Sequence, residues 1–123
     1  MDLDLVQNTI EELESADTTF SNCQTLASLY IVRDMYKPQV SQLLQADEKV
    51  AKELSDLFPQ YRNYREIKRK YQMKELPDSA LSDSMALLCQ ELREFLILLY
   101  NNTELPEERE CIQRTLHFVL KTA

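Results

Sequence analysis

The lone histidine of the sequence, His117, is the first residue to consider for proton transfer or metal binding. It lies in the apolar run 116–120, and no second histidine exists to complete a histidine-rich metal site. Cys111 is six positions away, outside the i, i+4 spacing that puts two ligands on one helix face. We therefore interpret His117 as a structural or surface residue and expect no catalytic, metal-binding or cofactor-binding site around it.

Two glutamate pairs with i, i+3 spacing, Glu91 with Glu94 and Glu107 with Glu110, are the second pattern that could do chemistry. The spacing resembles that of all-α nucleotide pyrophosphatases, whose paired carboxylates on neighbouring helices bind magnesium through hard oxygen ligands. In that family the second pair normally ends in aspartate, which is not the case here. With 21 acidic residues among 123, the spacing is also expected by chance, and it recurs at positions 11 and 14. A magnesium-dependent nucleotide pyrophosphatase is therefore the least favoured hypothesis.

A basic segment at 59–75 is the third candidate, because it carries six cations and only two anions, a local charge of +4. Since the whole chain has a formal net charge of −7, the remainder carries −11. Tyrosines interleaved with the cations could stack on bases, which suggests nucleic-acid binding. The six cations are Arg62, Arg65, Lys68, Arg69, Lys70 and Lys74.

A helical wheel at about 100° per residue separates the arginines of this segment from its tyrosines. Tyr64, Ile67 and Tyr71 fall on the side that we predict to be core. The arginines fall on the opposite side, with one tyrosine at the boundary, where it could stack beside them. A solvated cationic face that balances the acidic remainder is the alternative, because charge runs are commonly plain surface. The residues predicted to contact a partner are Tyr61, Arg62, Arg65, Arg69 and Lys70.

The absence of glycine limits both the fold and the ligands of this chain. Tight hairpin turns and phosphate-cradling loops usually need a residue that accepts positive φ, so a β-rich fold is disfavoured. The P-loop and the dinucleotide fingerprint are missing for the same reason. Hydrophobic residues at 44% and charged residues at 28% are ordinary globular values. We therefore predict an all-α fold with a single helical domain over 1–123.

Cysteine usage and the N-terminal residues bear on cellular location. Cys23, Cys89 and Cys111 are an odd number at wide spacings among apolar neighbours, a pattern typical of buried thiols in a reducing compartment. The acidic start at 1–4 lacks the charged-then-apolar order of a signal peptide. The longest apolar run, 95–100, is far shorter than the roughly 20 residues of a spanning helix. The sequence therefore predicts a cytoplasmic protein that is not integral to a membrane.

Apolar periodicity and proline positions predict a bundle of four to six helices joined by short loops. The first spans about 3–15, with Leu3, Val6, Ile10 and Leu13 on one face, and the second spans about 20–37 and ends before Pro38. Helical periods follow at 39–57, at 59–75 and from 106 onward. A polar gap around 47–49 interrupts the first of these, so a flexible linker or a frayed helix is expected around 37–50. The apolar arc predicted for the second helix consists of Phe20, Cys23, Leu26, Ala27, Tyr30 and Ile31.

The segment 81–99 shows the clearest periodicity in the chain. Asp78 or Ser79 can cap its start, and the asparagines at 101 and 102 can end it in left-handed geometry. Because 95–100 is apolar on all sides, we expect a central helix near 80–100 that neighbours contact from several directions. Its apolar residues recur in alternating steps of four and three, a heptad-like stripe of Leu81, Met85, Leu88, Leu92, Phe95 and Leu99.

The stretches 18–32, TTFSNCQTLASLYIV, and 64–72, YREIKRKYQ, resemble short helical proteins of unassigned function encoded by phages and prophages of Firmicutes. The resemblance covers most of the chain except about 37–50. It implies a phage or bacterial origin and a cytoplasmic setting in the host, and it brings no active site to carry over.

Three functions follow from these patterns, with a non-enzymatic helical interaction or accessory protein as the leading hypothesis. Such a protein would bind another protein through its surface. The alternative is a nucleic-acid-binding accessory or regulatory protein acting through the basic helix 59–75, which the acidic net charge disfavours because it repels phosphate except at a local patch. The pyrophosphatase-like enzyme comes third. No cofactor is predicted, and the sequence leaves a homo-oligomer open.

Overall fold

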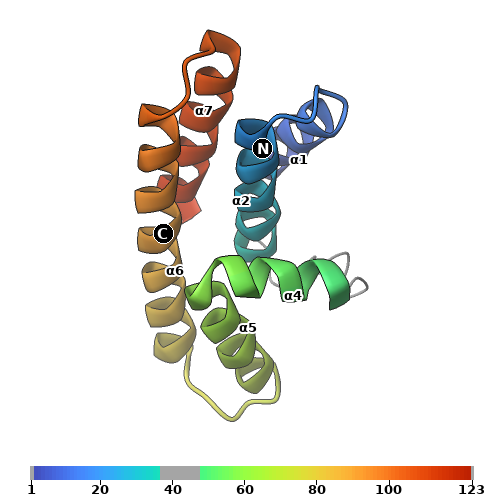
Figure 1. The fold of residues 1–123 in the computed structure, drawn as a ribbon. Helices are drawn as coiled ribbons and strands as arrows, with labels where there is room; N and C mark the ends of the chain where they lie inside the picture. Colours follow the sequence, from blue (N-terminus) through green and yellow to red (C-terminus); the bar gives the residue numbers. More distant parts are fainter. Residues whose placement is uncertain (1, 37–47, 123) are drawn as a thin grey trace.

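The computed structural model describes residues 2–36 and 48–122, and all regular structure within these ranges is α-helical. The predicted all-α bundle is confirmed, since the described residues form six helices (Figure 1). None of these helices combines the length and apolar content that crossing a bilayer requires. The helices are α1 (Asp2–Glu14), α2 (Phe20–Tyr36), α4 (Glu48–Leu57), α5 (Pro59–Gln72), α6 (Asp78–Asn101) and α7 (Pro106–Thr122).

Prolines and apolar periods place most helix starts where the sequence predicts them. Pro59 opens α5 and Pro106 opens α7, because a proline in the first turn removes only an N–H that has no helical acceptor there. The predicted linker around 37–50 lies outside the described residues up to position 47. Positions 48–50 are helical, because α4 begins at Glu48.

The two ends of α6 differ from the prediction. Pro77, in extended backbone, occupies the N-cap, and neither Asp78 nor Ser79 caps the helix through its side chain. Asp78 instead lies within the first turn, where a carboxylate complements the helix dipole. At the other end, Asn102 has a φ of −101° and is therefore not left-handed. Its N–H donates to the carbonyl oxygen of Leu98 at 3.2 Å, which continues the helical hydrogen-bond pattern.

The bundle is organised around the antiparallel pair α6 and α7, with α2 packed against both and α1 packed against α2 (Figure 1). α5 packs along α6, and α4 lies against α5 at the lower end of the view. The connections 15–19 and 102–105 lie at the opposite end, where the Thr103 hydroxyl is 3.4 Å from the Ser21 hydroxyl in the first turn of α2. The molecule therefore has two distinct ends, one built from α4 and α5 and the other from these two connections.

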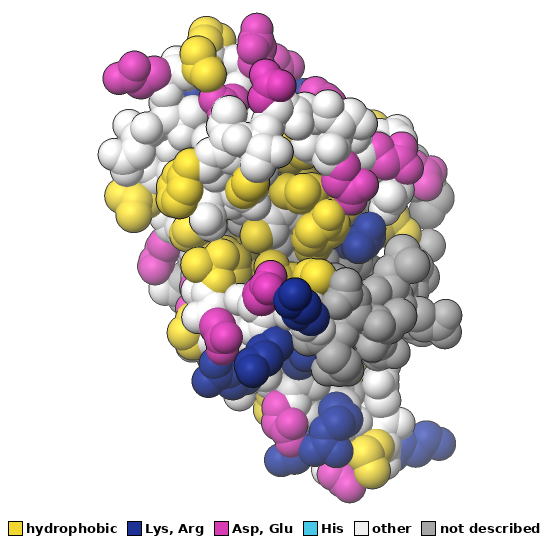
Figure 2. All heavy atoms as spheres, turned by 45° about the vertical axis from the view of Figure 1, so that its right-hand side comes forward, with side chains coloured by type: hydrophobic (Ala, Val, Ile, Leu, Met, Phe, Trp, Pro, Cys, Tyr) yellow, Lys and Arg dark blue, Asp and Glu magenta, His cyan; other side chains and the backbone are white. Residues whose placement is uncertain are grey.

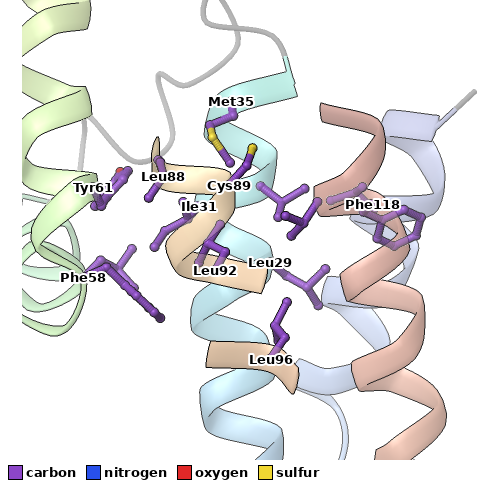
Figure 3. Packing of buried hydrophobic residues seen from close by; sticks show 14 of the residues in the cluster. Leu29, Ile31, Met35, Phe58, Tyr61, Leu88, Cys89, Leu92, Leu96 and Phe118 are labelled. Atoms are coloured by element: carbon purple, nitrogen blue, oxygen red, sulfur yellow. The ribbon is translucent and has the colours of Figure 1, made fainter. Parts of the chain in front are cut away.

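Side chains from α2, α5, α6 and α7 share one hydrophobic core (Figure 3). Leu92 and Leu96 of α6 point toward α2, whereas Leu88 lies on the side of Tyr61, and all three are fully buried. Phe58, just before α5, packs edge-on against Phe95 with 4.9 Å between ring centroids. The heptad-like stripe is therefore the inner face of α6, as its spacing predicts.

The last turns of α6 are less enclosed than expected, because its neighbours leave one side of the helix open to solvent. Leu98 is 63% exposed and Ile97 is 45% exposed. The predicted central helix is confirmed, because α2, α5 and α7 all contact α6, but its neighbours leave Ile97 and Leu98 uncovered. An apolar residue on a helix is buried only where a neighbouring element covers it.

The buried face of α2 agrees with the predicted one only in part, because Ile31 is buried and Leu26, Ala27 and Tyr30 pack against the core. Phe20, assigned to the core from its type, is 75% exposed. The face turned inward carries Ser21, Thr25 and Ser28, which are all buried. The Thr25 hydroxyl donates to the carbonyl oxygen of Ser21 at 2.8 Å, so it is satisfied within its own helix. Small hydroxyl side chains therefore share the interior side of α2 with the large apolar Leu29, Ile31 and Met35, which are also buried.

The sequence predicted that all three cysteines are buried, and this is wrong for one of them. Cys23 is exposed, whereas Cys89 and Cys111 are buried and burial raises the pKa of both thiols. Because a reagent reaches only an accessible thiol, Cys23 is expected to react rapidly in the native protein, and the two buried thiols only after unfolding. Thiol titration before and after adding denaturant measures this. A Cys23→Ser variant that keeps a fast-reacting thiol would contradict the assignment.

Candidate functional site

The cationic face of α5, which we call the basic face, consists of Arg62, Arg65, Arg69 and Lys70. Arg62 and Arg69 are exposed, with 66% and 57% of their side-chain surfaces accessible, as the helical wheel predicts. Lys70 is half-buried, as is Arg65, whose guanidinium lies 6.0 Å from the Tyr61 ring centroid. Figure 2 shows lysine and arginine side chains gathered toward the α4 and α5 end of the molecule.

Carboxylates lie among the cations of this face. Arg62 Nη2 is 3.0 Å from Asp56 Oδ1, and Arg69 Nη2 is 2.6 Å from Glu66 Oε1. Lys70 Nζ lies 3.9 Å from the same Glu66 oxygen. The hydrogen bond from Arg69 lowers the pKa of Glu66, so this carboxylate stays ionised beside the arginine. The face therefore presents alternating charges, and a phosphate backbone would have to compete with carboxylates already in place.

Tyr61 lies beside Arg65 but is buried, so it is not available to stack on a base as predicted. Its side chain has no exposed surface, and its hydroxyl donates to Asp34 Oδ2 at 3.2 Å. Burial raises the pKa of Tyr61, so the phenol stays protonated as a donor. Tyr64 is likewise fully buried and Tyr71 is half-buried, as the wheel predicts. The core side of α5 therefore includes Tyr61, and the basic face has no exposed tyrosine that could stack on a base.

A buried ion pair joins α2 to α5 beneath the basic face. Lys68 Nζ lies 2.8 Å from Asp34 Oδ1, and the two residues are only 4% and 3% exposed. The Lys68 ammonium is also 5.9 Å from the Tyr64 ring centroid, within the range of a cation–π contact. Because both side chains are buried, a substrate cannot reach them. The pair therefore anchors α5 to α2.

The position of Lys68 on the helical wheel of α5 is a sequence signal for its burial. Lys68 lies seven positions after Tyr61, which places both residues on the same face of a helix. It was therefore separable from the outward-facing arginines on the same wheel. The wheel could not identify the acceptor of Lys68, because Asp34 lies on another helix, 34 positions earlier in the chain.

The glutamate pairs considered for magnesium have separate structural environments. Glu91, half-buried on α6, accepts the Gln60 N–H at 3.2 Å and so caps the start of α5 from a neighbouring helix. Burial raises its pKa, whereas the hydrogen bond from Gln60 opposes that rise. Glu110 lies on α7 and pairs with Arg114 at 3.7 Å. In residues 2–36 and 48–122, no three histidine, cysteine or acidic side chains gather closely enough to hold a metal.

His117 is exposed on α7. The interpretation of His117 as a surface residue therefore agrees with its place in the structure.

Comparison of the chain with protein-family models, with curated proteins and with solved structures gives no match.

Proposed function

We propose that this protein is a non-enzymatic interaction or accessory protein of phage or prophage origin, which acts in the cytoplasm of the bacterial host. In this proposal the basic face of α5 binds an acidic surface on another protein. The observation that supports it is that Arg62 and Arg69 are exposed on a helix whose opposite side is held by the buried Tyr61 and Lys68. A rigid support lowers the entropic cost of presenting these cations to a partner.

A protein partner suits this face better than a nucleic acid does. The chain has a net charge of −7, which repels a phosphate backbone at long range. Asp56 and Glu66 stand among the arginines, so the local pattern is of mixed sign. Surfaces of proteins carry mixed charges that can complement such a pattern, whereas a phosphate backbone is uniformly negative.

Replacing Arg62 and Arg69 together by glutamate tests the proposal. Both side chains are exposed, so the fold is expected to change in stability by no more than about 1 kcal/mol in total. The variant Arg93→Glu with Lys121→Glu, which alters two exposed cations on α6 and α7, makes the same change in net charge elsewhere. Thermal melts followed by circular dichroism check the folding of both proteins.

Affinity capture from prophage-bearing cells then compares the wild type with the two variants. We expect the Arg62 and Arg69 variant to lose its protein partner and the matched control to keep it. A folded variant that keeps every partner would reduce this face to solvated surface. Recovery of nucleic acid instead, with an affinity that falls steeply as salt rises, would favour the alternative of a nucleic-acid-binding accessory protein.

A further inference from the structure

The C-terminal end of α5 carries an exposed apolar side chain among cations, and we call it the basic tip: Arg69, Lys70, Met73 and Lys74. Met73 is 58% exposed, and Arg69 Nη1 lies 3.6 Å from its sulfur. An exposed methionine within a charged rim is the arrangement of an interface anchor, in which one apolar group is buried and the surrounding charges select the partner.

The backbone holds this tip in one conformation. Lys74 has a φ of 61°, in the left-handed region, and its N–H donates to the Tyr71 carbonyl oxygen at 3.0 Å. The next N–H, that of Glu75, donates to the Lys70 carbonyl oxygen at 2.9 Å. These two bonds form a Schellman motif, in which the left-handed position is usually glycine. Met73 is therefore presented from an ordered helix end.

The opposite end of the molecule contains an acidic hollow of about 200 Å³, between the end of α1, the connection 15–19 and the first turns of α7. The Thr19 hydroxyl donates to the Glu108 carboxylate and holds the connection against α7. The lining of the hollow combines apolar with acidic side chains. The apolar ones include Leu13, Leu105 and Cys111, and the acidic ones include Asp17, Glu107 and Glu108.

The tip and the hollow are complementary in charge and in apolar character. Figure 2 shows acidic side chains gathered at the end of the molecule that carries the hollow and basic ones toward the end that carries the tip. Because α5 ends at the lower end of Figure 1 and the hollow lies at the upper end, one molecule cannot bring its own two surfaces together. A second copy of the chain can.

We propose that the basic tip of one copy docks into the acidic hollow of the next, with Met73 against its apolar lining and Arg69 and Lys74 facing its carboxylates. This inference rests on the proposed function, since Arg69 belongs to both surfaces, and it names a second copy of the chain as the partner. A contact between two different surfaces is heterologous, so each copy keeps one free tip and one free hollow. The protein then assembles head to tail into open chains.

Sedimentation velocity of the full chain tests this assembly. At about 0.01 M salt, where charges act over roughly 30 Å, the weight-average mass is expected to rise continuously with protein concentration. At about 1 M salt, where the range falls to roughly 3 Å, the association should weaken by about tenfold or more. A wild type that stays monomeric at every concentration in low salt would overturn the inference.

Two variants and a matched control separate this contact from other modes of association. The tip variant combines Met73→Ser with Arg69→Gln, and the hollow variant combines Leu105→Ser with Glu107→Gln; all four side chains are exposed. Each variant alone should be monomeric, and an equimolar mixture should form a one-to-one dimer that does not grow further. The control, Leu120→Ser with Arg93→Gln, changes exposed residues of the same types on other surfaces and should assemble like the wild type.

A monomeric mixture, or a control that disrupts assembly equally, would disprove tip-to-hollow docking. Failure of the docking is distinguishable from failure of the proposed function. If the wild type is monomeric but the Arg62 and Arg69 variant loses a captured partner, the proposed function stands and the second copy is the wrong partner. If chains form as described and no other protein is captured, the docking stands and the wider role of the basic face falls.

Discussion

Replacing Lys68 by alanine is expected to lower the free energy of unfolding by about 3–5 kcal/mol, the usual effect of removing one partner from a buried ion pair. The substitution leaves the Asp34 carboxylate buried at 3% exposure without the ammonium 2.8 Å away. An uncompensated charge in the protein interior costs several kcal/mol, so α5 should detach from α2 more readily. Denaturant unfolding followed by circular dichroism measures the loss.

A matched control for this prediction lies two positions along the same helix. Lys70→Ala removes the same side chain from a position with 42% of its side-chain surface exposed, and it should stay within about 0.5 kcal/mol of the wild type. Replacing the whole buried group, with Lys68→Met, Asp34→Leu and Tyr61→Phe, removes both charges and the hydroxyl that donates to Asp34. That triple variant should recover most of the lost stability. A small effect of Lys68→Ala would show that this pair does not anchor α5.

Truncating Leu92 to alanine is expected to cost about 2–5 kcal/mol, the range found for buried leucines. Leu92 lies in the middle of the inner face of α6 and has no exposed surface. Its removal leaves a cavity between α2, α6 and α7 that rigid helices fill only in part. The free energy of unfolding from denaturant titrations gives the value.

Leu98→Ala makes the same chemical change on the same helix at a position that is 63% exposed. It makes the same change in helix propensity and in side-chain size but removes little buried surface. We therefore expect the free energy of unfolding to fall by less than about 0.5 kcal/mol. The contrast tests the packing directly. Similar losses at the two positions would mean that α6 turns a different face to the core.

Local signals were sufficient to predict most of the helices. Val6, Ile10 and Leu13 recur at helical spacing and are buried on α1, and the stripe through Leu88 and Leu92 is the inner face of α6. Prolines at 59 and 106 mark helix starts, because a helix tolerates proline in its first turn but not in its interior. These features depend on residues within one or two turns of each other, which a single sequence contains completely.

Residue type was a poor guide to burial where helices pack closely. Phe20 and Cys23 were assigned to the core from their types, yet both are exposed. Thr25 and Ser28 occupy the interior instead, because their hydroxyls donate to carbonyl oxygens one turn earlier and their small size suits the helices around them. Which face of α2 is covered depends on its neighbours, and the apolar pattern of α2 alone did not specify it.

The candidate surfaces divide in the same way. The wheel placed Arg62 and Arg69 outside correctly, because outward and inward directions on α5 follow from its own period. It misplaced Tyr61, because the acceptor that draws its hydroxyl inward is Asp34 on another helix. The role of Lys68 was hidden for the same reason, since a charge is stable in the interior only beside a specific opposite charge.

The sequence by itself determined that the chain is helical, where most helices begin, and that 59–75 is basic within an acidic protein. Only the tertiary structure decided that the 15–19 connection meets α7 to form an acidic hollow, and that the basic tip lies at the opposite end. Helix formation is governed by hydrogen bonds four residues apart, which sequence neighbours specify. Hollows, buried ion pairs and opposed charged ends arise from residues far apart in the chain, so they exist only once the helices have packed.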